Sequence, residues 1–201
     1  MKDKTLHLFL INSILIILIW SGINPFDKFT WILEVLPAII GGFVLIIIYS
    51  KFKFTNLVYI LIWVHALILI VGGHYTYAQM PLFNVIRDIF NLNRNYYDRL
   101  GHFSQGFIPA IIAREILIRN NIVTKKKWLE FIIVCICLAI SASYELIEFA
   151  VAKFTGTSAE AFLGTQGDIW DTQWDMLFAL IGSIVAILTL SKYHNKQLSK
   201  K

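Results

Sequence analysis

The sequence predicts an all-α polytopic membrane protein, a bundle of about six transmembrane helices. Of its 201 residues, 57% are hydrophobic and only 15% are charged, whereas soluble domains are roughly 45–50% apolar and about 25% charged. The apolar residues also fall into separate runs of roughly 20, the length of helix that crosses about 30 Å of hydrocarbon. We therefore expect one transmembrane domain over residues 1–201.

Segments that combine polar residues with turn formers or charge separate these runs. The expected spans are residues 6–23, 30–50, 56–78, 100–118, 128–152 and 171–191. The first run follows basic residues, as in a signal peptide, but no small-residue cleavage site follows it, so we interpret it as a span. Residues 81–95 carry apolar side chains at nearly helical spacing, which predicts a short amphipathic helix on the outer membrane surface.

The distribution of lysine and arginine predicts that both termini lie in the cytoplasm. Loops on the cytoplasmic side of membrane proteins carry an excess of these residues. If the N-terminus is inside, 13 of the 18 basic residues fall on the inner side. The five outer basic residues are Lys28, Arg87, Arg94, Arg99 and Lys153.

The net charge of +5 does not indicate a nucleic-acid partner, because no polar segment interleaves basic and aromatic residues as binding surfaces for nucleic acids do. The partners expected from this composition are membrane lipids. The sequence leaves the oligomeric state open.

Ionisable side chains recur at one depth of the predicted bundle. Each costs roughly 2.5–3.5 kcal/mol at the centre of a span, so each calls for a reason. Counted from the cytoplasmic charge that ends each helix, Glu34, His102, Glu145 and Asp175 lie 17 or 18 residues away, or about 26 Å at about 1.5 Å per residue. We therefore expect these side chains in one layer near the outer boundary, with His74 slightly further out.

Three helices also carry two such residues on one face, because residues three or four positions apart are neighbours on a helix surface. The pairs are Asp98 with His102, Glu145 with Glu148, and Asp171 with Asp175. Carboxylates and histidines from facing helices form the metal sites of helix bundles, and an oxygen-rich set suits Mg, Mn, Fe(II) or Zn. The expected metal ligands are Asp98, His102, Asp171, Asp175 and His74. The expected catalytic base is Glu145 or Glu148.

Each pair also has a structural interpretation. The two aspartates of the last helix stabilise its N-terminus through the helix dipole. The two glutamates form interfacial ion pairs with Arg99 or Lys153, and Asp98 with Arg99 belongs to a solvated helix start. These separate explanations do not account for the shared depth, so a functional site at the outer face is the favoured hypothesis.

The segment at residues 156–175 combines glycines, tryptophans and aspartates. Glycines permit tight turns, and tryptophans favour the membrane interface. We expect a structured outer loop that folds over the polar layer and leads into the last helix, with Asp168 or Asp171 near its N-cap.

Four stretches resemble the YjdF family of bacterial inner-membrane proteins: VGGHYTYAQMPLFN, NYYDRLGHFSQGFIPA, ISASYELIEF and FLGTQGDIWDTQWDMLFALIGS. The chain is more remotely similar to VanZ-like proteins, which are linked to teicoplanin resistance, at residues 98–103, at Glu145 or Glu148, and at residues 175–182. The resemblance implies a bacterial inner membrane and the same polar residues, and it implies no particular activity.

Three functions fit these observations. The first is a metal-dependent enzyme that acts on a lipid head group or a cell-envelope lipid, with a metal-bound water as nucleophile. The second is a non-catalytic envelope protein that binds a head group. The third is an ion-coupled transporter, which ranks lower because transporter sites usually lie at mid-membrane between repeats, and the sequence shows neither feature.

Overall fold

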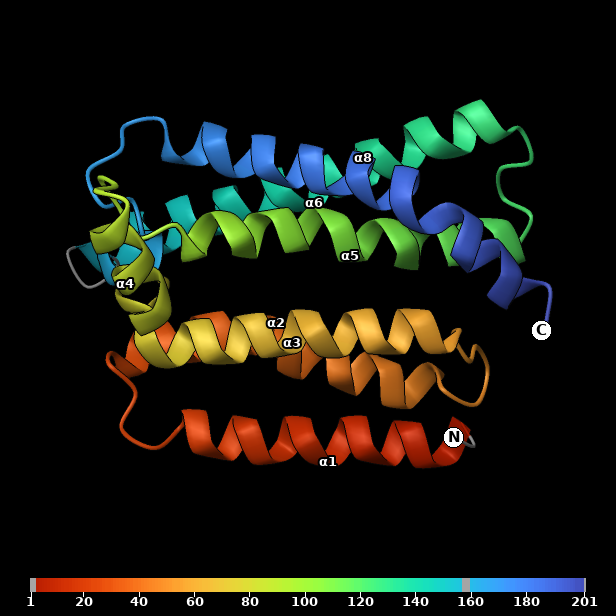
Figure 1. Cartoon of the computed structure of the whole chain (residues 1–201), viewed down its shortest axis with the longest axis horizontal. Helices are drawn as coiled ribbons and strands as arrows, with labels where there is room; N and C mark the ends of the chain where they lie inside the picture. The colour runs from red at the N-terminus through yellow and green to blue at the C-terminus, as the bar shows by residue number, and fades with distance from the viewer. Residues whose placement is uncertain (1–2, 157–159, 201) are drawn as a thin grey trace.

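The computed structural model describes residues 3–156 and 160–200, and over these residues it contains six long helices and no strand. The long helices are α1 (Asp3–Ser21), α2 (Lys28–Ile48), α3 (Asn56–Tyr75), α5 (Tyr97–Arg119), α6 (Lys126–Thr155) and α8 (Asp171–Leu198). The short elements are η1 (Tyr77–Gln79), α4 (Pro81–Ile89) and α7 (Glu160–Leu163). Consecutive long helices run in opposite directions, so both termini lie at the same end (Figure 1). The predicted all-α bundle is confirmed.

Five of the long helices are long and apolar enough to cross a membrane: α1, α2, α3, α6 and α8. The sixth, α5, has 23 residues, enough for a span, but it is the least apolar of the six long helices. It lies inside the bundle, where it packs against α3, α6 and α8 (Figure 1). Four of its five charged residues are buried, namely Asp98, Arg99, Arg114 and Glu115. The protein therefore shields these charges from lipid.

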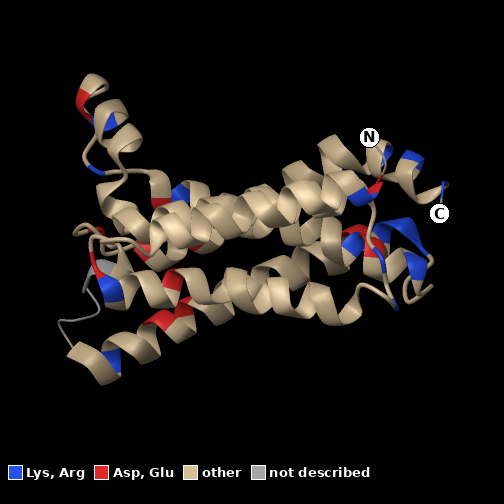
Figure 2. Ribbon diagram, turned by 90° about the horizontal axis from the view of Figure 1, so that it is seen from below, with Lys and Arg blue, Asp and Glu red and all other residues tan. Residues whose placement is uncertain are grey.

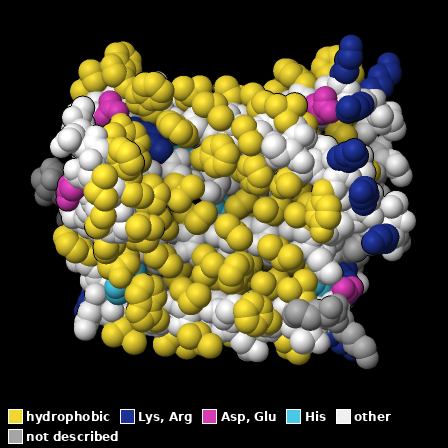
Figure 3. Space-filling view, viewed as in Figure 1, with side chains coloured by type: hydrophobic (Ala, Val, Ile, Leu, Met, Phe, Trp, Pro, Cys, Tyr) yellow, Lys and Arg dark blue, Asp and Glu magenta, His cyan; other side chains and the backbone are white. Residues whose placement is uncertain are grey.

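The surface has the pattern of a protein that crosses a membrane. Hydrophobic side chains cover most of the face in Figure 3, and lysine and arginine gather at the end where the chain begins and finishes. Large apolar residues such as Ile46 and Leu188 are 72% and 77% exposed. Because basic residues stay on the cytoplasmic side, we assign the end that carries the termini to the cytoplasm.

Most helix ends differ from the predicted bounds by one to three residues, and the end of α8 differs by seven. Helix α3 ends at Tyr75 instead of residue 78, because Thr76 has a left-handed backbone with φ of 52° and η1 follows. Helix α8 continues to Leu198, beyond the apolar run that ends at residue 191. Side chains in this extension hold it in place: Gln197 accepts a hydrogen bond of 3.0 Å from the backbone N–H of Leu57.

The amphipathic segment forms α4, as predicted. Pro81 occupies the first turn, where a helix loses no hydrogen bond to proline. None of its residues is buried, and the helix projects from the end of the bundle opposite the termini (Figure 2). Its place on the membrane surface stays a prediction.

Helices α5 and α8 make the closest contact between helices in the bundle, and two glycines permit it. A Cβ atom added to Gly106 would lie 1.8 Å from the carbonyl oxygen of Ala179, and one added to Gly182 would lie 2.1 Å from that of Phe103. Small residues allow such backbone contact between membrane helices. The contact fixes the register of α5 against α8 and so brings their polar ends together.

Candidate functional site

Three helices meet at the end opposite the termini: the start of α5, the second half of α6 and the start of α8. Their polar side chains, with two from the adjoining loops, form a group that we call the polar cluster. Its members are Arg94, Asp98, Arg99, His102, Glu145, Glu148, Asp168, Asp171 and Asp175. All but Asp168 are buried. The cluster therefore lies inside the protein at the boundary of the apolar surface.

Two arginines hold the aspartates at the start of α8. Arg94 and Arg99 donate to the same oxygen of Asp171, Oδ1, over 2.5 and 2.6 Å. Arg99 also donates to Asp175. The Oδ2 atom of Asp98 lies 3.4 Å from Arg94 and 3.5 Å from Arg99. Because both arginines already donate to Asp171, it is less available than the other aspartates to bind a metal.

The loop before α8 packs around Arg94. Arg94 donates to the carbonyl oxygen of Gly164 over 3.1 Å. Gln166 accepts a 2.8 Å bond from the backbone N–H of Asn95 and donates a 2.9 Å bond to its carbonyl oxygen. The expected structured loop is therefore present over residues 164–170, while residues 157–159 of that expectation lie outside the described part of the chain. The N-cap is Trp170, and Asp168 accepts a hydrogen bond from its N–H over 2.9 Å.

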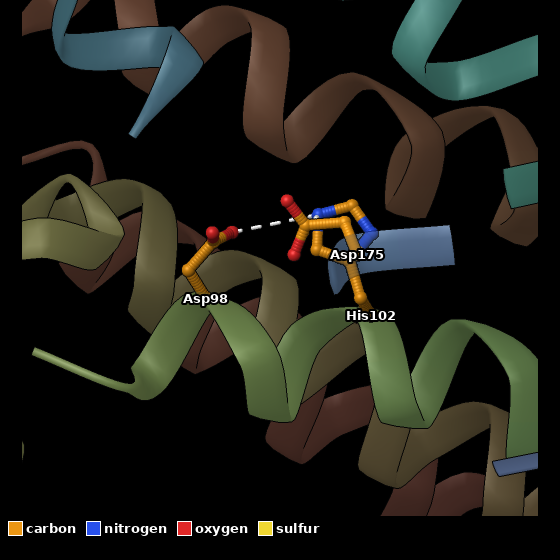
Figure 4. A group of neighbouring side chains, drawn as sticks. All are labelled: Asp98, His102 and Asp175. Carbon is orange, nitrogen blue, oxygen red and sulfur yellow. Dashed lines mark ion pairs between the residues drawn. The ribbon is translucent and has the colours of Figure 1, made fainter. Parts of the chain in front are cut away.

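His102 lies between the carboxylates of two helices. Its Nε2 atom is 3.5 Å from Oδ1 of Asp98 and 3.5 Å from Oδ1 of Asp175, and the three side chains point toward one another from α5 and α8 (Figure 4). Its Nδ1 atom lies 3.1 Å from Oε1 of Gln105. In the tautomer whose Nδ1–H donates to Gln105, the Nε2 atom that faces the two aspartates is free to bind a metal, as in metal-binding histidines.

The two glutamates of α6 have few partners. Glu145 lies 3.7 Å from Nδ1 of His102, and its Oε1 atom is buried without a hydrogen bond. Among the described residues, no ion pair joins Glu145 or Glu148 to Arg99 or Lys153, the pairing that the structural interpretation required. Buried carboxylates with so few donors are costly, so these two call for a ligand or a proton.

Glu34 from α2 adds a carboxylate beside the cluster. The hydroxyl of Tyr144 donates to Glu34 over 3.5 Å. The hydroxyl of Tyr77, on η1, is buried without a hydrogen-bond partner in the described residues. Burial, with Glu34 nearby, raises the pKa of the Tyr77 phenol well above its usual value, so this group stays protonated near neutral pH and is available as a donor.

Two sets of side chains converge closely enough to hold one metal ion. They are Asp98, His102 and Asp175, and His102, Glu145 and Glu148, each with ligand atoms within 4.8 Å of one another. Only the first set uses Nε2 of His102 and leaves the bond from Nδ1 to Gln105 in place. Two carboxylates and an imidazole suit the divalent metals that the sequence suggested, Mg, Mn, Fe or Zn.

The structure brings six of the seven predicted site residues into the polar cluster: Asp98, His102, Glu145, Glu148, Asp171 and Asp175.

It does not bring His74 to them. The Nδ1 atom of His74 lies 2.9 Å from the carbonyl oxygen of Ser21, and its ring packs 4.5 Å from that of Trp20. His74 therefore faces α1, away from the polar cluster, and is not one of the converging ligands.

Sequence reasoning assigned Arg94 no site role and considered Arg99 only as an ion-pair partner. Both were counted among the outer charges that set the topology. A signal was present, because Arg94 precedes Asp98 by four positions and Arg99 follows it directly. Opposite charges four residues apart are typical of ion pairs. Here Arg94 pairs with Asp98 on α5 and also with Asp171 on α8.

Comparison with known proteins agrees with the fold. The family model described as "Predicted membrane protein (DUF2238)" matches residues 6–196. The chain is 45% identical over 201 residues to "Inner membrane protein YjdF" of Escherichia coli (strain K12), covering 98% of this chain and 96% of that protein. No solved structure matches. The more remote resemblance to VanZ-like proteins stays a prediction. The chain belongs to the DUF2238 family and is a multi-pass protein of the bacterial inner membrane.

Proposed function

We propose that the polar cluster is a divalent-cation site at the extracytoplasmic face, and that the protein is a metal-dependent enzyme acting on a lipid head group. The observation that carries the proposal is the convergence of Asp98, His102 and Asp175 from two helices. The Nδ1 atom of His102 lies 3.1 Å from Oε1 of Gln105, and its Nε2 atom faces both aspartates. This is the geometry of a ligand set oriented by a second hydrogen bond.

The charge balance of the cluster supports a bound cation. Its carboxylates outnumber its two arginines, and among these carboxylates the arginines pair with the four aspartates. Glu145 and Glu148 remain without an arginine partner among the described residues. Buried charge needs an opposite charge or a proton, and a divalent cation beside His102 supplies the opposite charge to both α6 glutamates and the aspartates.

The residues around this position have the roles that hydrolysis of a phosphoester requires. A bound divalent cation lowers the pKa of water and polarises a phosphoryl oxygen. Glu145, whose Oε1 has no hydrogen bond, is placed to accept a proton from that water. Arg99, which donates to Asp175, is placed to neutralise charge on the phosphate.

A carrier function has less support. Alternating access needs a path that opens between helices on both sides of the site. Below the cluster, Gly106 and Gly182 bring the backbones of α5 and α8 into direct contact, so this interface has no room for a path. A head-group-binding protein without catalysis uses the same site and differs from the enzyme only in turnover.

The test is a turnover assay with the purified protein in vesicles of phospholipid or of lipid-linked envelope precursors. Mg, Mn or Zn is expected to promote release of a water-soluble head-group product, and a chelator to stop it. Glu145→Gln and His102→Ala are expected to slow release by about 10²-fold or more. His74→Ala is the matched control, because His74 lies outside the polar cluster, and it retains turnover. Product release that is equal in the native chain and in His102→Ala contradicts the proposal.

A further inference from the structure

A groove lies beside the polar cluster on the surface of the protein. Its volume is about 230 Å³, and its lining residues are Arg94, Tyr96, Arg99, Asp168, Trp174 and Phe178. A second hollow of about 290 Å³ is lined by Trp170, Gln173, Trp174 and Leu177. Trp174 belongs to both, so the hollows adjoin along the first turns of α8.

The groove contains charges of both signs between aromatic walls. Arg94 and Arg99 are buried with their side chains only 7% and 4% exposed. The Nε atom of Arg94 has no acceptor within the described part of the chain. Asp168 is the most accessible carboxylate of the polar cluster, with 28% of its side chain exposed. A ligand in the groove therefore meets two guanidinium groups, one carboxylate and the faces of aromatic rings.

We propose that this groove binds the head group of a zwitterionic aminophospholipid, with its phosphate against the arginines and its ammonium against Asp168 and the aromatic rings. Arginine pairs suit phosphate oxygens, and an ammonium group is attracted both to a carboxylate and to aromatic faces. This lipid would be the substrate of the proposed enzyme, and any reaction after binding rests on the proposed function.

The mixed charge distinguishes this head group from an anionic one. Asp168 and Asp171 both lie against the two arginines. An ammonium group is attracted by these aspartates, whereas the uncharged glycerol of an anionic head group such as that of phosphatidylglycerol gains no such attraction. The groove is therefore expected to prefer phosphatidylethanolamine to phosphatidylglycerol.

The adjoining surface suits the acyl chains. The second hollow is mainly apolar, and an exposed apolar stripe continues from it along α8 at helical spacing. The stripe consists of Leu177, Ile181, Ile184 and Leu188. Trp170 and Trp174 lie beside the stripe at the start of α8. Tryptophans favour the membrane interface, at the level of the lipid head groups. A lipid whose head group fills the groove thus has its chains against the hydrophobic face of α8.

Binding of phosphatidylethanolamine and phosphatidylglycerol with identical acyl chains, measured by native mass spectrometry on the detergent-purified chain, tests the assignment. The native chain is expected to bind phosphatidylethanolamine about tenfold more tightly. Trp174→Ala lowers that affinity about tenfold, the size of one strong cation–π contact. Asp168→Asn removes the preference. Trp128→Ala, which changes an exposed tryptophan on α6 far from the groove, leaves both affinities unchanged.

Equal affinity of the native chain for the two lipids, or an unchanged affinity in a folded Trp174→Ala protein, overturns the assignment. The His102→Ala variant separates this assignment from the proposed function. A lipid preference that persists in His102→Ala, with no turnover in the native chain, supports the groove and refutes the enzyme. Turnover without any lipid preference refutes the groove and leaves the enzyme standing.

Discussion

At the scale of residues, Asp171 shows how neighbouring charges decide the role of a carboxylate. From its spacing alone, Asp171 is as good a candidate ligand as Asp175, which lies four positions away on one helix face. In the structure Oδ1 of Asp171 accepts hydrogen bonds from both Arg94 and Arg99, while Asp175 also approaches His102. A cation at Asp171 would have to displace two guanidinium groups. Asp171 therefore holds the arginines in place, and Asp175 is the better ligand.

Asp171→Ala is expected to lower the stability of the detergent-solubilised chain by about 3 kcal/mol, because the change removes an acceptor that two buried guanidinium groups share. This is the lower end of the usual range for a broken buried pair, since other aspartates remain. Thermal unfolding measures the effect. The matched control is Asp88→Ala: Asp88 pairs with Arg87 at the surface, with 67% of its side chain exposed, and such pairs contribute little. Equal effects of the two variants would refute this role for Asp171.

The depth count predicted part of the site because an α-helix has a fixed rise per residue. It placed Glu34, His102, Glu145 and Asp175 in one layer, and the structure joins His102 to Glu145 and Asp175. Depth alone gives no direction around the helix. His74 has nearly the predicted height but faces Ser21 on α1.

The spacing of four residues indicates the ion pair of Arg94 with Asp98, but it does not indicate the contacts of Arg94 with the loop before α8. The place of Arg94 depends on the carbonyl oxygens of Gly164 and Thr165, some 70 residues later in the chain. Contacts between loops so distant in sequence follow from the packed fold and have no local pattern.

At the scale of elements, α5 and α8 carry two polar networks of different character. Near the cytoplasmic end, Glu115 accepts hydrogen bonds from Thr55, Arg119 and His194. His194 in turn accepts one from Arg114 over 3.0 Å. Each partner of Glu115 is a donor, as a structural network requires. At the other end Oε1 of Glu145 has no hydrogen-bond donor among the described residues, and this contrast is the reason for assigning the site to that end.

Gly106→Ala tests the helix contact that aligns both networks. A methyl group at this position would meet the carbonyl oxygen of Ala179 at 1.8 Å, so α5 and α8 must separate. We expect a loss of about 2 kcal/mol or more in unfolding free energy, the usual cost of overpacking. Gly41→Ala, also within a membrane helix but with no atom inside 4 Å of the added Cβ, is expected to be neutral or slightly stabilising. A neutral Gly106→Ala would contradict the close contact.

At the scale of the whole molecule, the position of the site depends on the orientation of the bundle. The polar cluster and α4 lie at one end, and the termini with most lysines lie at the other (Figures 1 and 2). The positive-inside rule therefore places the cluster outside the cytoplasm.

Reporter fusions in bacterial cells test this orientation. Green fluorescent protein at the C-terminus is expected to fluoresce, because it folds in the cytoplasm. Alkaline phosphatase fused after Asn93, between α4 and α5, is expected to be active, because it folds outside the cytoplasm. The reverse pattern would place the polar cluster in the cytoplasm and refute an extracytoplasmic activity.

The metal content of the purified chain tests the central claim most directly. After purification without chelators and exposure to Mg, Mn and Zn, inductively coupled plasma mass spectrometry is expected to find about one metal ion per native chain. We expect His102→Ala and Asp175→Asn to lose it, where asparagine keeps an acceptor for Arg99 and lacks the charge. His74→Ala should retain it. A native chain without metal, or equal metal in His102→Ala, would contradict a cation site in the polar cluster.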